Sequence, residues 1–279
     1  MLGSSGLHEA GFINNRVVIK MNASATIDAT FDYAAQLKYF GLTEAPTVLT
    51  RRKRMAHLSS LSETAGGESA AVLGSTVAAY DQALSEDDRQ AFDDTILYAE
   101  IRADKLFNRE TQRREWYGEY SKAVTNCGWP TVNDPYKEYV SQEVDLTLDE
   151  AALKIIALVA GADKLQILPL ISAAFNALEK NDGAIKLVEL KSKKNKAANF
   201  QAVPCVSLGG RPTMIACAMQ MESREIITKV LFFKFRKEDI RLYNAATRRT
   251  LNRRAYNVVK DIIQSEVDKS RLAYFKTPL

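Results

Sequence analysis

The sequence predicts an α+β fold, with a helical N-terminal part packed against a mainly antiparallel C-terminal sheet and a final amphipathic helix. Two observations predict it. From Ser85 to about Gly183, apolar residues recur at steps of three and four, as on one face of a helix. After Gly183 they gather in short runs separated by Gly, Pro and polar residues, as in strands joined by turns.

The first predicted helical block begins at Ser85, which forms a plausible capping box with Asp88 three residues later. Its apolar face carries residues such as Phe92 and Ile96, and the pattern resumes at Trp116 after a polar stretch. We expect the block to end near residue 128, where a glycine precedes two prolines.

Two further helices are predicted in the middle of the chain. Thr147 and Glu150 form a second capping box ahead of an apolar helix over residues 151–160 that Gly161 closes. A second helix is expected over residues 165–180. Because both are apolar on most faces, we expect them to lie in the middle of the fold.

The strands are predicted after residue 186. Runs over 200–208 and 213–220 are joined at Gly209-Gly210, as in a hairpin. A third run, 226–235, is apolar on both faces and is expected to be a central strand, and a fourth covers 240–244. An amphipathic helix over about 252–265 follows.

The expected organisation has two parts. Residues 59–76 are rich in Ser, Gly, Ala and Thr, so we expect a loop there. Residues 1–80 are expected to form a separate N-terminal segment that contains this flexible loop. Residues 81–279 show no linker and are expected to form a single intertwined α+β domain.

Composition and motifs disfavour most enzyme classes. The chain has 279 residues, 46% of them hydrophobic, with 3 Cys and 2 His. Two histidines are too few for most metal or catalytic sites that are built on histidine. No phosphate-binding loop, dinucleotide fingerprint or nucleophile elbow is present, so no metal or nucleotide cofactor is expected. No secretory signal is visible either, which predicts cytoplasmic synthesis, with peripheral membrane association or export by another route.

The cysteines allow three interpretations. Cys205 and Cys217 lie in apolar runs and Cys127 lies at a predicted helix end near Trp129, and the first interpretation is that all three are small buried side chains. The alternatives are a thiol-dependent enzyme, for which His8 and His57 offer no convincing partner, and a thiol that carries an acyl group. An acylated cysteine needs no histidine, only an apolar cavity or a membrane face for the chain.

Scattered motifs resemble a known family. They are Glu115-Trp116-Tyr117, Gly128-Trp129, Asn181-Asp182-Gly183, Asn199-Phe200-Gln201 ahead of Cys205, Val230-Leu231-Phe233-Lys234-Phe235 and Thr250-Leu251-Asn252. Together they resemble the Evf-like virulence factors, associated with persistence in the insect gut, over about residues 85–270. The resemblance implies a non-enzymatic virulence protein with an α+β fold and a fatty acid, palmitate, joined to a cysteine as a thioester. It places the acyl group on Cys205, with Cys217 as the second candidate.

The charge is distributed unevenly and indicates a partner. The net charge is only +4, but residues from 186 onward hold 20 Lys and Arg against 8 Asp and Glu, and earlier residues hold 18 against 26. A basic region adds to single-chain acylation by attracting an anionic membrane surface. It equally suits nucleic acid in a nucleocapsid-like alternative, and a host factor is a further expected partner. The residues expected to contact lipid headgroups or phosphates are Lys191, Lys193, Lys194, Lys196, Arg236, Lys237, Arg248, Arg249, Arg253 and Arg254.

Overall fold

The computed structural model describes residues 31–43, 60–61, 69–131, 136–140, 145–194, 196–224, 226–227, 230–232, 234–236 and 238–276. The chain divides into two units, Met1–Phe31 and Asp32–Leu279. All features below belong to the second unit. The boundary expected after residue 80 falls inside this unit, because strands on both sides of it share one sheet.

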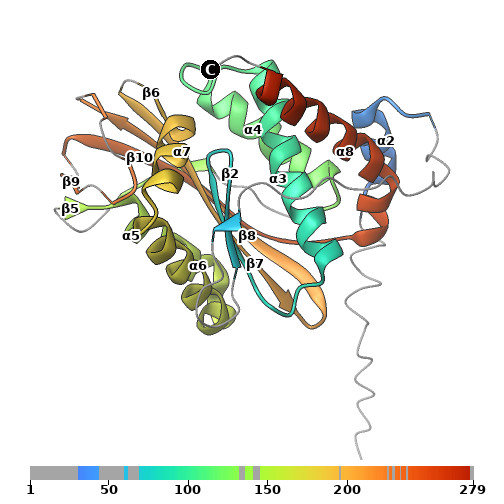
Figure 1. Ribbon diagram of the computed structural model, residues 1–279, viewed down its shortest axis with the longest axis horizontal. Helices are drawn as coiled ribbons and strands as arrows, with labels where there is room; N and C mark the ends of the chain where they lie inside the picture. The colour runs from blue at the N-terminus through green and yellow to red at the C-terminus, as the bar shows by residue number, and fades with distance from the viewer. Residues whose placement is uncertain are drawn as a thin grey trace, which may run out of the picture. The chain divides into compact units, whose positions relative to one another are not determined.

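A large mixed sheet forms the centre of the second unit (Figure 1). Its strands follow the order β1-β2-β3-β7-β8-β10-β4, with β6 paired to β7. All described pairs are antiparallel except β3 with β7. The strands are β1 (Ser60–Leu61), β2 (Ser69–Leu73), β3 (Thr76–Tyr80), β4 (Tyr136–Tyr139), β6 (Lys193–Lys194), β7 (Ala197–Leu208), β8 (Arg211–Ser223) and β10 (Ile240–Thr250); β5 (Asp145–Leu146) and β9 (Phe235–Arg236) form a separate pair.

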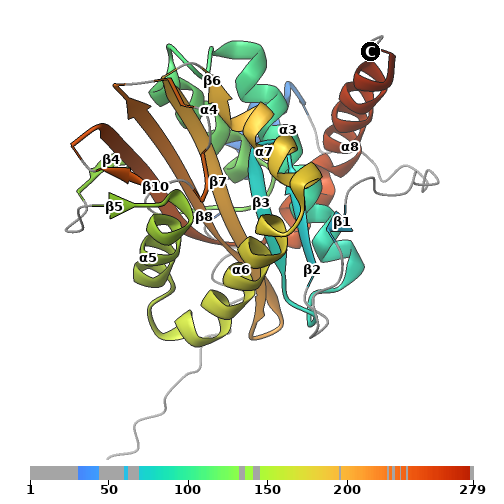
Figure 2. The same cartoon turned by 60° about the vertical axis from the view of Figure 1, so that its left-hand side comes forward.

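Helices cover both faces of this sheet (Figure 2). Helices α3 (Glu86–Leu106), α4 (Arg113–Asn126) and α8 (Arg253–Lys276) lie on one face, with α2 (Tyr33–Phe40) against α4. Helices α5 (Leu148–Ala160), α6 (Lys164–Glu179) and α7 (Asp182–Ser192) lie on the other, and a 3₁₀ turn over Gly161–Asp163 joins α5 to α6. The expected α+β class is confirmed, and its arrangement is a sheet between two helical layers.

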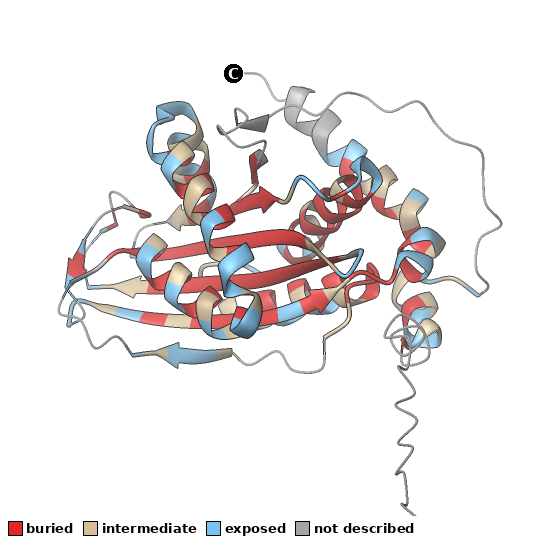
Figure 3. Ribbon diagram, turned by 90° about the horizontal axis from the view of Figure 1, so that it is seen from below, coloured by how far each residue is buried: buried red, intermediate tan, exposed pale blue. Residues whose placement is uncertain are grey.

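Alternation along the central strands creates two separate cores. Successive side chains of a strand point to opposite faces of a sheet. On β7, Phe200 and Ala202 therefore pack with α5 and α6, whereas Val203 and Cys205 pack with α3 and α4. Both faces of β7 and β8 are buried over most of their length, as Figure 3 shows.

The local start and stop signals are confirmed. The Ser85 hydroxyl accepts from the Asp88 amide at the start of α3, and Thr147 and Glu150 form a complete capping box ahead of α5. Gly161 ends α5 with a φ of 57°. These signals are local because each depends only on groups within one turn of the helix.

Four expectations are wrong. Within the described residues of the run 226–235 (226–227, 230–232 and 234–235), no residue joins the central sheet: Phe235 alone is in a strand, paired in the small second sheet, and Ile226 is 71% exposed. Within the segment 59–76, which is predicted to be a loop, residues 69–73 form β2 and Thr76 begins β3, and the sequence patterns do not predict helix α7. Finally, α5 and α6 form an outer layer with exposed leucines instead of lying in the middle of the fold.

Candidate functional site

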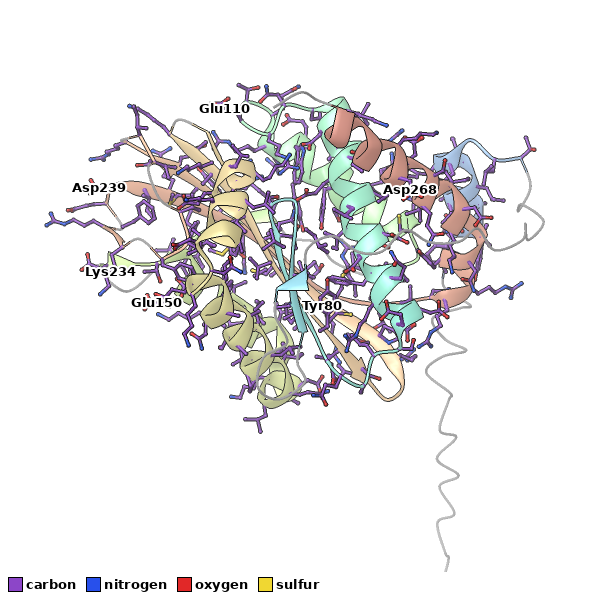
Figure 4. All side chains as sticks on the ribbon, viewed as in Figure 1. Tyr80, Glu110, Glu150, Lys234, Asp239 and Asp268 are labelled. Carbon is purple, nitrogen blue, oxygen red and sulfur yellow. The ribbon has the colours of Figure 1, made fainter. Side chains whose placement is uncertain are left out.

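Cys205, the favoured acyl site, lies on β7 and faces α3. In the sheet it lies between Tyr80 on β3 and Met214 on β8, and it has no exposed surface. Tyr80 lies in the interior (Figure 4) and donates a hydrogen bond of 2.5 Å to Asp93. Burial raises the pKa of the Cys205 thiol well above its ordinary value, and nearby carboxylates including Asp93 raise it further. The site of Cys205 is therefore buried but close to negative charge.

Cys217 lies on the opposite face of the sheet, beneath α5. Its neighbours across the strands are Ala202 on β7 and Ala246 on β10, so no large side chain flanks it within the sheet. It belongs to the apolar core that α5 and α6 cover, and it has no exposed surface. Burial raises the pKa of the Cys217 thiol to about 12. Its surroundings are more uniformly apolar than those of Cys205.

The thiol-enzyme alternative finds little support in these positions. A thiol nucleophile reacts as the thiolate. Burial raises the pKa of Cys127 as well as those of Cys205 and Cys217, so all three thiols are protonated at neutral pH. His8 and His57 lie outside the described residues.

Of the expected basic contacts, Arg249 is buried instead, and Arg253 is half-exposed and forms an ion pair. Arg249 is 1% exposed and donates to Thr125, to the carbonyl of Trp129 and to other groups of the interior. Arg253 forms a pair of 2.7 Å hydrogen bonds with the Asp88 carboxylate, which fixes the start of α8 on the start of α3. Arg249 is therefore unavailable to a membrane or a phosphate, and the charge of Arg253 is neutralised.

The remaining basic residues have varied environments. Arg248 pairs with Asp163 at 2.7 Å, and Lys193 pairs with Glu189 at 3.2 Å. Arg236 lies 4.0 Å from Glu238 and is 70% exposed. Figure 4 shows the neighbouring Lys234 and Asp239 at the end of the molecule that carries β5 and β9. Lys191, Lys196 and Arg254 are exposed, whereas Lys237 and the side chain of Lys194 lie outside the described residues.

The sequence patterns did not reveal an exposed apolar corner. We define the α5–α6 corner as residues 157–168, where α5 ends and α6 begins. Leu158 is 81% exposed and Leu165 is 82% exposed, on either side of the turn at Gly161. Lys154 and Lys164 are also exposed nearby. Apolar composition predicts these two helices, but which of their apolar side chains face solvent depends on how the helices pack on the sheet.

Among the described residues, the stretch Leu148–Glu179 is long and apolar enough to cross a membrane, with 33% of its apolar window buried. Length and composition alone support this, and core helices of soluble proteins have the same properties. Here the stretch is bent at Gly161, and α5 and α6 pack against each other. The arrangement therefore presents a short apolar corner to the outside, not a straight span.

No protein-family model matches the chain, and no curated protein matches it. Among solved structures, that of the Evf virulence factor matches with a TM-score of 0.39 and 10% identity, covering 71% of this chain and 82% of that chain. A delta-endotoxin matches with a TM-score of 0.37 and 11% identity, covering 75% of this chain and 92% of that chain. Similarity this distant is at the level of the fold and carries no inference about activity.

Proposed function

We propose that the chain is a non-enzymatic virulence protein that associates with membranes through the α5–α6 corner and a fatty acyl group on Cys217. The virulence role follows the resemblance of the sequence motifs to Evf-like factors. The observation that carries the membrane role is the exposure of Leu158 and Leu165 at one corner of the molecule.

The chemistry of the corner favours a lipid surface. Between residues 155 and 178 the only charged residues are Asp163 and Lys164, and Arg248 neutralises Asp163. Exposing two leucines by more than four-fifths of their surface to water is unfavourable, and inserting them between lipid chains lowers the free energy. Lys154 and Lys164 are placed to contact headgroups as the leucines enter the apolar layer.

The acyl group strengthens this attachment. One acyl chain or one small apolar patch gives marginal, reversible binding, and two signals together give stable binding. We assign the thioester to Cys217 in preference to Cys205, because Cys217 belongs to the apolar core that α5 and α6 cover. Cys217 therefore lies on the same side of the sheet as the α5–α6 corner. The Cys217 sulfur would attack the carbonyl of an acyl-thioester donor, forming the new thioester and releasing the donor thiol. Because this sulfur is buried, the transfer would precede the packing of α5 onto β8.

Vesicle co-sedimentation tests the corner. Burying two leucines contributes about 3 kcal/mol, so the double change Leu158→Asp with Leu165→Asp should lower partitioning about 100-fold or more. The matched control is Leu106→Asp with Leu190→Asp, two leucines that are 50% and 73% exposed on other helices. Equal loss in both double variants, or no binding of the wild-type protein to phosphatidylcholine or phosphatidylserine vesicles, would refute the role of the corner.

Intact-mass spectrometry of protein from its native host tests the acyl group. We expect a mass excess of one fatty acyl chain that hydroxylamine removes and that is missing in Cys217→Ser. Retention in Cys217→Ser with loss in Cys205→Ser would transfer the assignment to Cys205. An unmodified wild-type protein would overturn the acyl part of the proposal while leaving the vesicle experiment unaffected.

A further inference from the structure

Two tyrosine rings stack at one edge of the main sheet. Among the described strands, β4 is the last in the sheet order on that side and pairs with β10 (Figure 2). Tyr136 on β4 and Tyr243 on β10 have ring centroids 5.7 Å apart and ring planes 8° from parallel. Tyr136 also lies 6.2 Å from the ring of Tyr117 on α4, which is 4% exposed. The row of rings therefore runs from the interior to the surface, where Tyr136 and Tyr243 are partly exposed.

A buried amide holds the two rings in place. Gln220 on β8 lies opposite Tyr243 in the sheet, and its side-chain oxygen accepts a hydrogen bond from the Tyr136 hydroxyl. Its amide nitrogen donates to the carbonyl of Arg113, at the start of α4, at 3.3 Å. These contacts place both rings on the face of the sheet that α4 covers. A ligand that stacks there meets a preformed surface, so little free energy is lost in ordering the side chains.

Exposed arginines lie beside the two rings. Arg241 precedes Tyr243 by two residues on β10, so both side chains point to the same face of the sheet, and Arg241 is exposed. Arg114, in the first turn of α4, is exposed as well. Arg114 is close enough to influence the pKa of Tyr136: burial raises this pKa, and the charges of Arg113 and Arg114 oppose the rise.

The acidic residues nearby do not neutralise these arginines. Glu222 binds Arg113, so this pair adds no net charge. Glu138 lies opposite Tyr243 on β4 and is exposed, and the adjacent Lys137 is exposed too, so their charges cancel. The two exposed arginines therefore leave the surface around the rings with a positive charge.

We propose that Tyr136 and Tyr243, with Arg114 and Arg241 beside them, bind single-stranded nucleic acid. A base stacks on the outer ring, and phosphates contact the two guanidinium groups. A single strand fits better than a duplex, whose bases are already stacked on one another. An acidic peptide or an anionic membrane would match the arginines but would make no use of the stacked rings. This surface shares no residue with the α5–α6 corner, so it does not depend on the membrane role.

Fluorescence anisotropy of a labelled oligothymidylate of about 12 nucleotides, titrated with the full chain at low salt, tests the stacking. Tyr243→Ala should weaken binding about 5- to 150-fold, the effect of losing one base stack, whereas Tyr243→Phe keeps the ring and should bind as the wild-type protein does. The matched control is Tyr33→Ala, since Tyr33 is also partly exposed and its ring lies 5.7 Å from the guanidinium of Arg254. The proposal is overturned if the oligonucleotide does not bind the wild-type protein, or if Tyr33→Ala weakens binding as much as Tyr243→Ala.

A second measurement makes the result independent of any folding defect in Tyr243→Ala. Arg114→Gln with Arg241→Gln changes only exposed side chains and should reduce the slope of log affinity against log salt by about 1.4, the value for two phosphate contacts on a single strand. The control Lys186→Gln with Lys191→Gln, two exposed lysines of α7, should leave the slope unchanged. Equal changes in both double variants would overturn the proposal. So would displacement of the oligonucleotide by a polyglutamate peptide or phosphatidylserine vesicles as effectively as by unlabelled oligonucleotide.

Discussion

Replacing Arg249 by methionine tests whether this residue is a structural anchor, as its position indicates. Arg249 lies on β10 and its guanidinium reaches α4 and the residues after it. It donates to Thr247 at 3.0 Å, Thr125 at 2.9 Å, the Trp129 carbonyl at 3.0 Å and Ser121 at 2.6 Å. Methionine keeps most of the buried chain volume but donates none of these bonds.

The expected loss follows from the hydrogen bonds. Each of them contributes about 0.5–1.5 kcal/mol net, and four together reach about 4 kcal/mol if they were additive. Because methionine is itself favourable in an apolar core, we expect the free energy of unfolding to fall by about 3 kcal/mol. For a unit of this size, that lowers Tm by about 6–12 °C.

Urea unfolding followed by circular dichroism measures the difference. Arg248→Met is the matched control, because Arg248 is the preceding residue on the same strand but its side chain is 42% exposed and forms a surface ion pair. That control should cost less than about 1 kcal/mol. A structural role for Arg249 is refuted if both variants lose the same free energy of unfolding, or if Arg249→Met unfolds at the wild-type urea midpoint. Arg249 would then again be a candidate for contact with lipid headgroups or phosphates.

Three further outcomes are expected. The pKa of Asp88 is lowered overall: burial opposes ionisation, but the hydrogen bonds from Arg253 and from Ser85 outweigh it. The stability that Asp88 contributes is therefore fully present above the pKa of Asp88 in the unfolded chain, and it is lost as pH falls through the pKa of Asp88 in the folded protein. Asp88→Asn should lower the free energy of unfolding by about 1 kcal/mol at pH 7. The urea midpoint of this variant should also fall less steeply than that of the wild-type protein as the pH is lowered. Gly74→Ala should destabilise by about 2 kcal/mol in the same assay, because φ is +60° and the new Cβ would lie 1.8 Å from a Glu100 carboxylate oxygen. Finally, in protein that carries no acyl group, the thiols should not react with Ellman's reagent at pH 8 until urea unfolds the chain, since all three are buried and burial raises the pKa of Cys217 to about 12; rapid reaction of a native thiol would contradict this.

Much of the secondary structure was predictable because its signals are local. The capping groups at Ser85 and Thr147, and the glycine pair that joins β7 to β8, act within a few residues and were placed correctly. The sequence patterns do not predict β2, because the segment around it is rich in small residues, and Ala70 and Ala71 are buried only by packing between two helical layers. The central strand predicted over 226–235 is wrong for the opposite reason: its described core residues, such as Ile227, Val230 and Leu231, are apolar because they cover the core, and they do not pair with the main sheet.

The sequence by itself determined the α+β class, the positions of most helices and the set of candidate thiols and cations, since periodicity and capping depend on near neighbours. Only the tertiary structure decided what those residues do. It placed Cys205 near carboxylates and Cys217 beneath α5, on opposite faces of one sheet. It buried Arg249 and exposed Leu158, although their residue types suggest the reverse. The physical reason is that burial and pairing arise where distant strands and helices meet, and these contacts are not encoded in any single segment.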